Sequence, residues 1–347
     1  MTAVRTPGSV SEKRGRSGPV VLTGLALALG VAVGVDLLLG RGVSAGQVLP
    51  ALLDPDSTEG RILLLVRLPR VATAVIAGAA LGVAGLVLQT VLRNPLASPE
   101  LTGVNTAAVL GVVVAIAFAL VPTDSSVGLL LAALVAGLAG GLAVWLLVGR
   151  TDPEQQLLAG VLMAAAAGGA VLLFLALRSS RFASVVRWLV GSVDGRVWSD
   201  LQWVGPWIAG GIVVLALAGG VLPVLAGGDA HAHALGVPPR AARLLLLGGA
   251  LALVAGSAAV AGALTFIGLA VPHLVRGLLG ELGRWSVPAA ALVGAVLLCL
   301  CDALAQIVTG LLIGSAVSER VGIPAGAVAA VAGAVTLVLS LRRQERP

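Results

Sequence analysis

The chain has 347 residues, of which 58% are hydrophobic and only 11% charged, with a formal net charge of +6. Soluble domains keep about a quarter of their residues charged, so this composition excludes a soluble globular fold. The basic residues lie scattered between apolar runs and form no stripe with aromatic residues, which argues against nucleic-acid binding.

Apolar runs follow one another along the chain, and a helical span needs about 20 apolar residues. The run 266–280 is shorter and contains Pro272 and His273, but the chain must cross back there. The sequence predicts an all-α polytopic membrane protein of about ten spans, forming one domain over 20–341. In chain order the expected spans are 20–40, 70–92, 102–121, 127–149, 157–177, 202–226, 242–264, 266–280, 286–313 and 323–341.

The short connecting segments predict the orientation. Most of the 22 Lys and Arg residues fall on one side if the N-terminus is cytoplasmic, so both tails, 1–19 and 342–347, are expected inside. The remaining arginines lie outside, which indicates that the outer face uses positive charge. The outer segment 178–200, which contains Trp188 and Trp198, is expected to form an amphipathic helix on the membrane surface.

Enzyme chemistry is not expected of this chain. Its single lysine, Lys13, lies outside any phosphate-binding loop motif, so we expect no ATP hydrolysis. The histidines, His231, His233 and His273, have no clustered cysteine or carboxylate beside them, so neither a metal site nor a bound cofactor is expected.

Asp302 lies inside a predicted span, with Gln306 one turn later. A carboxylate at that depth is costly and suggests either a proton or cation relay or a hydrogen-bonded residue that fixes helix packing. We expect no second intramembrane acid beside Asp302, which favours the packing role.

A set of ordered phrases carries the strongest signal. They are RLPR (67–70), GAALGVAGLVLQ (78–89), RNPLASPELTGVNTAA (93–108), LLAGV (157–161), HALGVPPRAARLL (233–245), GALTFIGLAVPHLVRGLLG (262–280) and IPAG (323–326). In order and spacing the chain resembles the FecCD-type permeases, the membrane subunits of ABC importers for ferric siderophores, haem and vitamin B12. The resemblance covers nearly the whole chain from about residue 60 onward.

The resemblance implies a type II ABC importer permease fold in a bacterial cytoplasmic membrane. Two permease subunits, alike or related, would enclose one path. Two ABC ATPase subunits would dock inside and a substrate-binding protein outside. Arg67 and Arg70 match the family's outward arginines, which pair with glutamates of the binding protein, and Arg320 is expected to add a docking charge.

The segment 229–240 matches the coupling element that sits in a groove of the ATPase. Its expected contact residues are His233, Ala234, Leu235, Gly236, Val237, Pro238 and Arg240. The fifth span matches the helix that lines the path, through Gly160, Met163, Ala164, Ala167 and Gly168. Pro153 and Glu154 occupy the position of the inner gate.

The chain departs from the family at Gln306, where an arginine is usual, and in the ERVGIP stretch that replaces E-L-P-x-G. A ferric siderophore is the expected substrate, with haem and cobalamin as alternatives. A different class, an ion-coupled secondary transporter, also remains open.

Overall fold

The computed structural model describes residues 17–40, 42–122, 125–148, 153–177, 185–313 and 322–344, and these residues form helices and connecting turns without strands. Seven helical segments of this part are long and apolar enough to cross a membrane, and three shorter helices are also apolar. This confirms the predicted all-α polytopic fold.

The long spans are α1 (Gly18–Leu39), the continuous segment α3 (Thr58–Ile62), η2 (Leu63–Arg67) and α4 (Leu68–Val91), then α6 (Ser126–Val148), α7 (Pro153–Leu177), α9 (Trp198–Leu217) with α10 (Val221–Ala226), α12 (Pro239–Ala261) and α14 (Ser286–Ile313). The shorter spans are α5 (Val104–Ala117), α13 (Ile267–Leu279) and α15 (Ala325–Gln344). Short helices between the spans are α2 (Val48–Leu53), η3 (Pro99–Thr102), α8 (Val185–Val190) and α11 (Asp229–Ala234).

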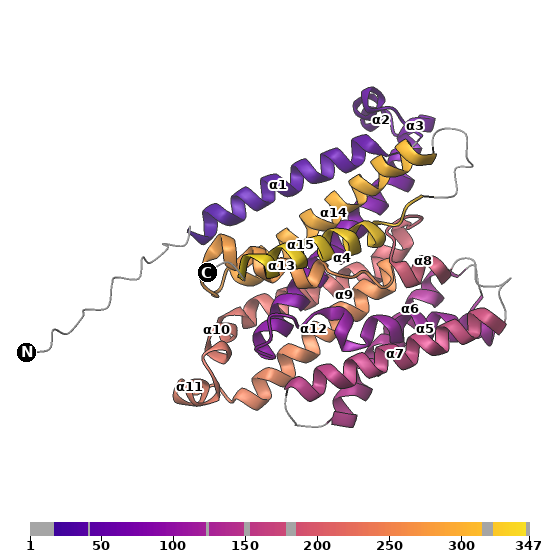
Figure 1. Ribbon diagram of the computed structural model, residues 1–347. Coiled ribbons are helices and arrows are strands. Elements are labelled where there is room, and N and C mark those ends of the chain that lie inside the picture. The colour runs from indigo at the N-terminus through magenta and orange to yellow at the C-terminus, as the bar shows by residue number, and fades with distance from the viewer. Residues whose placement is uncertain are drawn as a thin grey trace, which may run out of the picture.

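Figure 1 shows short helices at both ends of the bundle. One end carries α2, α3 and α8, and the other carries α10 and α11 together with the start of α1. With the predicted orientation, α10 and α11 lie at the cytoplasmic end and α2 and α3 at the outer end.

The helix α4 forms the centre of the bundle, and glycines let its neighbours approach closely. A Cβ atom on Gly78 would stand 2.4 Å from the carbonyl oxygen of Gly294 on α14. On Gly85 it would stand only 1.9 Å from the carbonyl oxygen of Gly268 on α13. Small residues at helix contacts are the usual means by which membrane helices pack closely.

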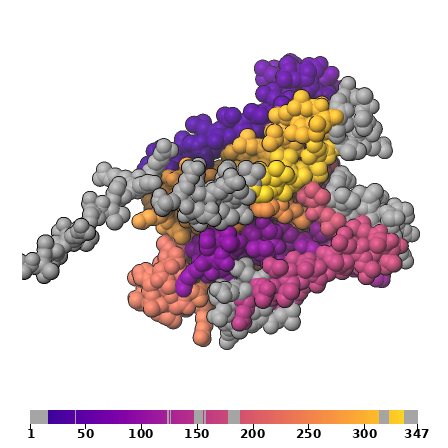
Figure 2. Space-filling view, in the orientation of Figure 1, coloured from indigo at the N-terminus to yellow at the C-terminus, as the bar shows by residue number. Residues whose placement is uncertain are grey.

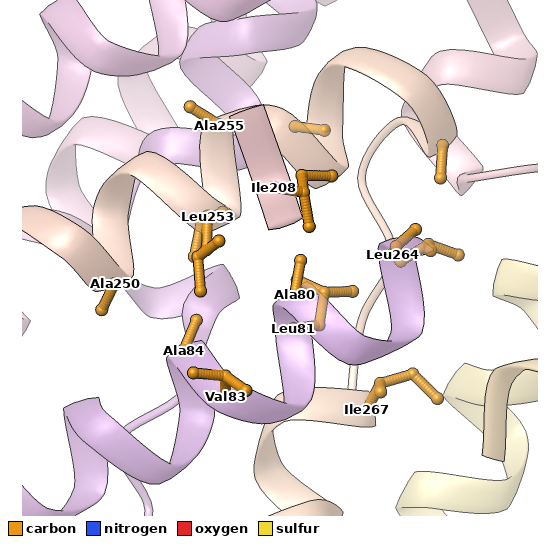
Figure 3. Packing of buried hydrophobic residues seen from close by; sticks show 14 of the residues in the cluster. Ala80, Leu81, Val83, Ala84, Ile208, Ala250, Leu253, Ala255, Leu264 and Ile267 are labelled. Carbon is orange, nitrogen blue, oxygen red and sulfur yellow. The ribbon is translucent and has the colours of Figure 1, made fainter. Parts of the chain in front are cut away.

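Apolar side chains fill the remaining space around α4. Figure 3 shows Ala80 and Ala84 of α4 facing Leu253 of α12, with Ile208 of α9 nearby. Ala80 and Leu253 are completely buried. The buried small residues of α4 explain why the sequence there reads as an Ala/Gly run.

The connection between α12 and α13 is packed inside the bundle. Its backbone takes left-handed φ values at Gly262 and Phe266, +72° and +66°. The nitrogen of Ala263 donates to the carbonyl oxygen of Trp188, at 2.8 Å. Trp188 itself is only 6% exposed. The predicted short helix is present as α8, but the expectation that Trp188 lies on the membrane surface is wrong, because the α12–α13 connection supplies a backbone partner and an apolar site inside the protein.

Candidate functional site

The inner end of the bundle carries the predicted coupling element. The turn after α11 takes a left-handed φ of +75° at Gly236, and α12 begins at Pro239 directly after it. Figure 2 shows α10 and α11, coloured salmon, protruding from the rest of the molecule. The apolar side chain of Leu235 is 58% exposed at this protrusion.

Most of the predicted coupling residues are accessible at this end. Val237 is partly buried, and exposed residues are His233, Ala234, Leu235, Gly236, Pro238 and Arg240. Ala232, between the two histidines of α11, is completely buried and holds the helix against the bundle. The helix thus presents one face outward and anchors the other.

A cluster of charges joins α11 to two spans. Asp229, the first residue of α11, accepts a hydrogen bond from Arg93 at 2.8 Å and one from Arg243 of α12 at 3.1 Å. Arg93 follows the end of α4 and also donates to the carbonyl oxygen of Leu225 in α10, at 3.1 Å. Desolvation acts to raise the pKa of the Asp229 carboxyl, but the hydrogen bonds and charges of the two arginines outweigh it and hold that pKa below its usual value.

The outer end places Arg67 differently from the prediction. Its side chain donates to the carbonyl oxygen of Leu37 at 2.6 Å and also to those of Gly40 and Val43. These groups lie at and after the end of α1, where helix carbonyls lack partners within the helix. Arg67 is only 4% exposed, so the expectation of an outward docking charge is corrected to a buried cap of α1.

Arg70 is also engaged within the subunit. Its guanidinium holds both oxygens of Asp302, at 2.7 and 2.9 Å, and donates to Asp194 at 2.9 Å. This bidentate geometry joins α4 to α14 and supports the packing role expected of Asp302. Arg70 keeps 21% of its side chain exposed, so its docking role stays a prediction.

The expectation that Asp302 has no second acid nearby is wrong. Asp36 of α1 is 1% exposed, and Gln306 donates from the same nitrogen to Asp36 and, at 3.1 Å, to Asp302. Asp36 lies within the predicted first span 20–40, so the sequence offered this signal. A single carboxylate in an otherwise apolar span marks a candidate functional residue on α1 as it does on α14.

The predicted path residues on α7 fall on two faces. Gly160 packs against η3, since a Cβ there would stand 2.1 Å from the carbonyl oxygen of Leu101, and Ala167 is 4% exposed. These two residues therefore face their own subunit, which corrects their assignment to an open wall. Met163, Ala164 and Gly168 are partly exposed, so their assignment stays a prediction.

The remaining predicted residues have no described side chain. Pro153 begins α7 and Glu154 follows it, but their side chains lie outside the described residues, as does the whole of Arg320. Their roles as inner gate and docking charge stay predictions. The Asp229 cluster was not foreseen, because Arg93 and Asp229 are 136 residues apart and no local pattern marks the pair.

Comparison with known proteins identifies a family and individual proteins to which this chain is similar. The sequence profile of the FecCD transport family matches residues 25–343. The Fe(3+)-citrate import system permease protein YfmE of Bacillus subtilis is 31% identical over 339 residues, which cover 96% of this chain and 97% of that protein.

A further relative and a solved structure are also similar to this chain. The cobalamin import system permease protein BtuC of Halobacterium salinarum is 33% identical over 298 residues, which cover 82% of this chain and 80% of that protein. A solved inward-facing structure described as a metal-chelate type ABC transporter superposes with a TM-score of 0.79 at 28% identity. The superposition covers 94% of this chain and 99% of the solved chain.

Proposed function

This chain belongs to the FecCD transport family of ABC importer permeases, and we propose that it forms the translocation path of a ferric-siderophore importer in a bacterial cytoplasmic membrane. Substrate would be delivered by a binding protein at the outer end, where α2 and α3 lie. A second permease subunit, identical or related, would complete the path.

The observation that carries the proposal is the anchored protrusion of α10 and α11. An exposed apolar residue such as Leu235 on a cytoplasmic segment is a typical protein-contact residue. Asp229 ties the same helix to Arg93, beside the end of α4, and to Arg243 of α12. An ATPase subunit that moves α11 would therefore pull on two long, buried spans at once.

The proposed substrate class rests on the substrates that appear in the names of similar proteins. The Bacillus subtilis relative is named for iron citrate, a ferric chelate, and the Halobacterium salinarum relative for cobalamin. A ferric siderophore shares with iron citrate a metal held in a soluble organic chelate. Haem and cobalamin are the alternatives for the same architecture.

Reconstitution in vesicles tests the proposal. We expect the purified chain alone to show neither ATP hydrolysis nor uptake, because its sequence has no phosphate-binding loop. ATP-dependent uptake should appear once an ATPase and a binding protein from the same cell are added. Competition among a ferric siderophore, haem and cobalamin would then identify the substrate.

The same vesicles separate the importer from the ion-coupled transporter. Uptake driven by a pH or sodium gradient across vesicles that contain only this chain, without ATP, would contradict the proposed function. Uptake of haem or cobalamin in preference to the siderophore would leave the importer standing and replace its substrate.

A further inference from the structure

Helix α1 lies at the edge of the bundle and packs mainly against α14. Most of α1 is exposed, and its buried residues are Val21, Ala32 and Asp36. Asp36 is the one acidic residue of α1 and lies where this helix contacts α14. Its burial at 1% exposure needs a physical explanation, because an unpaired carboxylate in an apolar environment is very costly.

The surroundings of Asp36 offer no free cation among the described residues. Arg70 lies nearby, but its hydrogen bonds go to Asp302 and Asp194. The other titratable group that faces Asp36 is the thiol of Cys299, which carries no positive charge. A second arginine, Arg67, lies at the carbonyl oxygen of Leu37, the residue after Asp36, and donates to backbone carbonyl oxygens there. Two arginines thus stand near three carboxyl groups, two of which are almost completely buried.

The hydrogen bonds of Asp36 show a similar shortage of partners. One oxygen of Asp36 accepts from Gln306, and the other, Oδ2, is buried without a hydrogen-bond partner in the structure. The nitrogen of Gln306 that serves Asp36 also serves Asp302, so the two carboxyl groups converge on one amide. Two carboxylates that share a site cannot both stay ionised, and one of them takes up a proton.

We propose that Asp36 and Asp302 form a proton-binding carboxyl pair that holds one proton at neutral pH and fastens the outer end of α1 to α14. The proton resides on Asp36, because both oxygens of Asp302 are engaged by Arg70. The proton removes the negative charge from a carboxyl group whose Oδ2 is buried without a hydrogen-bond partner in the structure. A metal ion is a poorer occupant, since the described residues contain no group of three or more His, Cys, Asp or Glu side chains arranged to hold one.

Infrared spectroscopy of the full chain in lipid nanodiscs tests the proton directly. The difference between the natural chain and Asp36→Asn should contain a protonated-carboxyl band that shifts in heavy water. The matched control Asp56→Asn removes an exposed carboxyl near α2 and should leave that band in place. Absence of a protonated-carboxyl band from the first difference spectrum would overturn the proposal.

A second variant keeps both carboxyl groups and changes only the charge between them. Gln306 is partly exposed, so Gln306→Arg can extend its charged end toward the outer surface while it pairs with Asp36. With a further cation placed between them, both acids should ionise and the band should vanish. Persistence of the band in folded Gln306→Arg would contradict the charge argument.

Thermal unfolding against pH gives an independent readout. The folded chain should bind one more proton than the unfolded chain, so its stability should fall as pH rises. Between about pH 5 and about pH 7, where an unfolded aspartate is ionised but the folded pair still holds its proton, the folding constant of the natural chain should drop by up to about tenfold per pH unit relative to Asp36→Asn. Parallel profiles for the two chains would overturn the proposal, and so would a sodium-dependent rise in Tm that Asp36→Asn abolishes.

Discussion

At the scale of single residues, Asp229 has the most connected position at the inner end. It pairs with Arg93 and Arg243, yet about half of its side chain, 49%, is exposed. Exposed ion pairs contribute about 1 kcal/mol or less each to stability. The cluster therefore contributes mainly through the connection that it makes between α11, α4 and α12, and little through added stability.

We predict that Asp229→Asn lowers substrate uptake per ATP hydrolysed several-fold while the thermal stability changes little. The amide keeps the size of the side chain but loses the charge that both arginines contact. Arg93→Gln should reproduce the effect, and the double variant should be no worse than either single one. The test measures uptake and ATP hydrolysis in the same vesicles, and unchanged coupling in Asp229→Asn would refute the connection.

The pH dependence of this cluster has a definite sign. The pKa of Asp229 is lowered in the folded chain, so its stabilising contribution is present above the unfolded value, about 3.9, and is lost as pH falls through the folded value. The cluster should therefore stay intact throughout the neutral range.

At the scale of helices, close backbone contact decides the packing of α4. A Cβ on Gly85 would stand 1.9 Å from a backbone oxygen of α13, which cannot move aside as a flexible side chain could. Gly24 of α1, in contrast, has nothing within 4 Å of an added Cβ. The two glycines are chemically identical and differ only in their neighbours.

We predict that Gly85→Ala destabilises the folded chain by about 1–3 kcal/mol or more, since an added methyl group overpacks the contact. Gly24→Ala should be neutral or slightly stabilising, because alanine favours a helix over glycine by about 1 kcal/mol. Thermal unfolding in detergent, followed by tryptophan fluorescence, measures both. Equal Tm values for the two variants would show that α4 and α13 do not meet as described.

The same helices show what a sequence can predict. Span positions follow from local hydropathy, so the predicted run 70–92 matches α4 within two residues at its start. The surroundings of Trp188 could not be predicted in this way, because its burial depends on a connection more than seventy residues later in the chain. Arg67 was likewise misplaced, since the loop carbonyls that it caps carry no sequence signature.

At the scale of the whole molecule, α4 links the two ends. Arg70 in its first turn belongs to the outer carboxyl network, and Arg93, just beyond its last turn, belongs to the inner cluster. Between them most residues of α4 are buried, and the helix packs against α12, α13 and α14. A displacement at α11 therefore has a rigid, central element through which to reach the outer end.

The two ends should consequently serve different partners, and a pair of matched variants can separate them. Leu235 after α11 is 58% exposed and Leu53 of α2 is 80% exposed, so an aspartate at either position costs the fold little. We predict that Leu235→Asp abolishes retention of the ATPase subunit and ATP-driven uptake, because a charge replaces the apolar contact. Leu53→Asp should retain the ATPase normally, because the hydrocarbon core, about 30 Å thick, separates it from that partner. Membrane level, ATPase pull-down and uptake are measured side by side. Equal ATPase retention by both variants would show that the ATPase subunit does not bind at the α10–α11 protrusion.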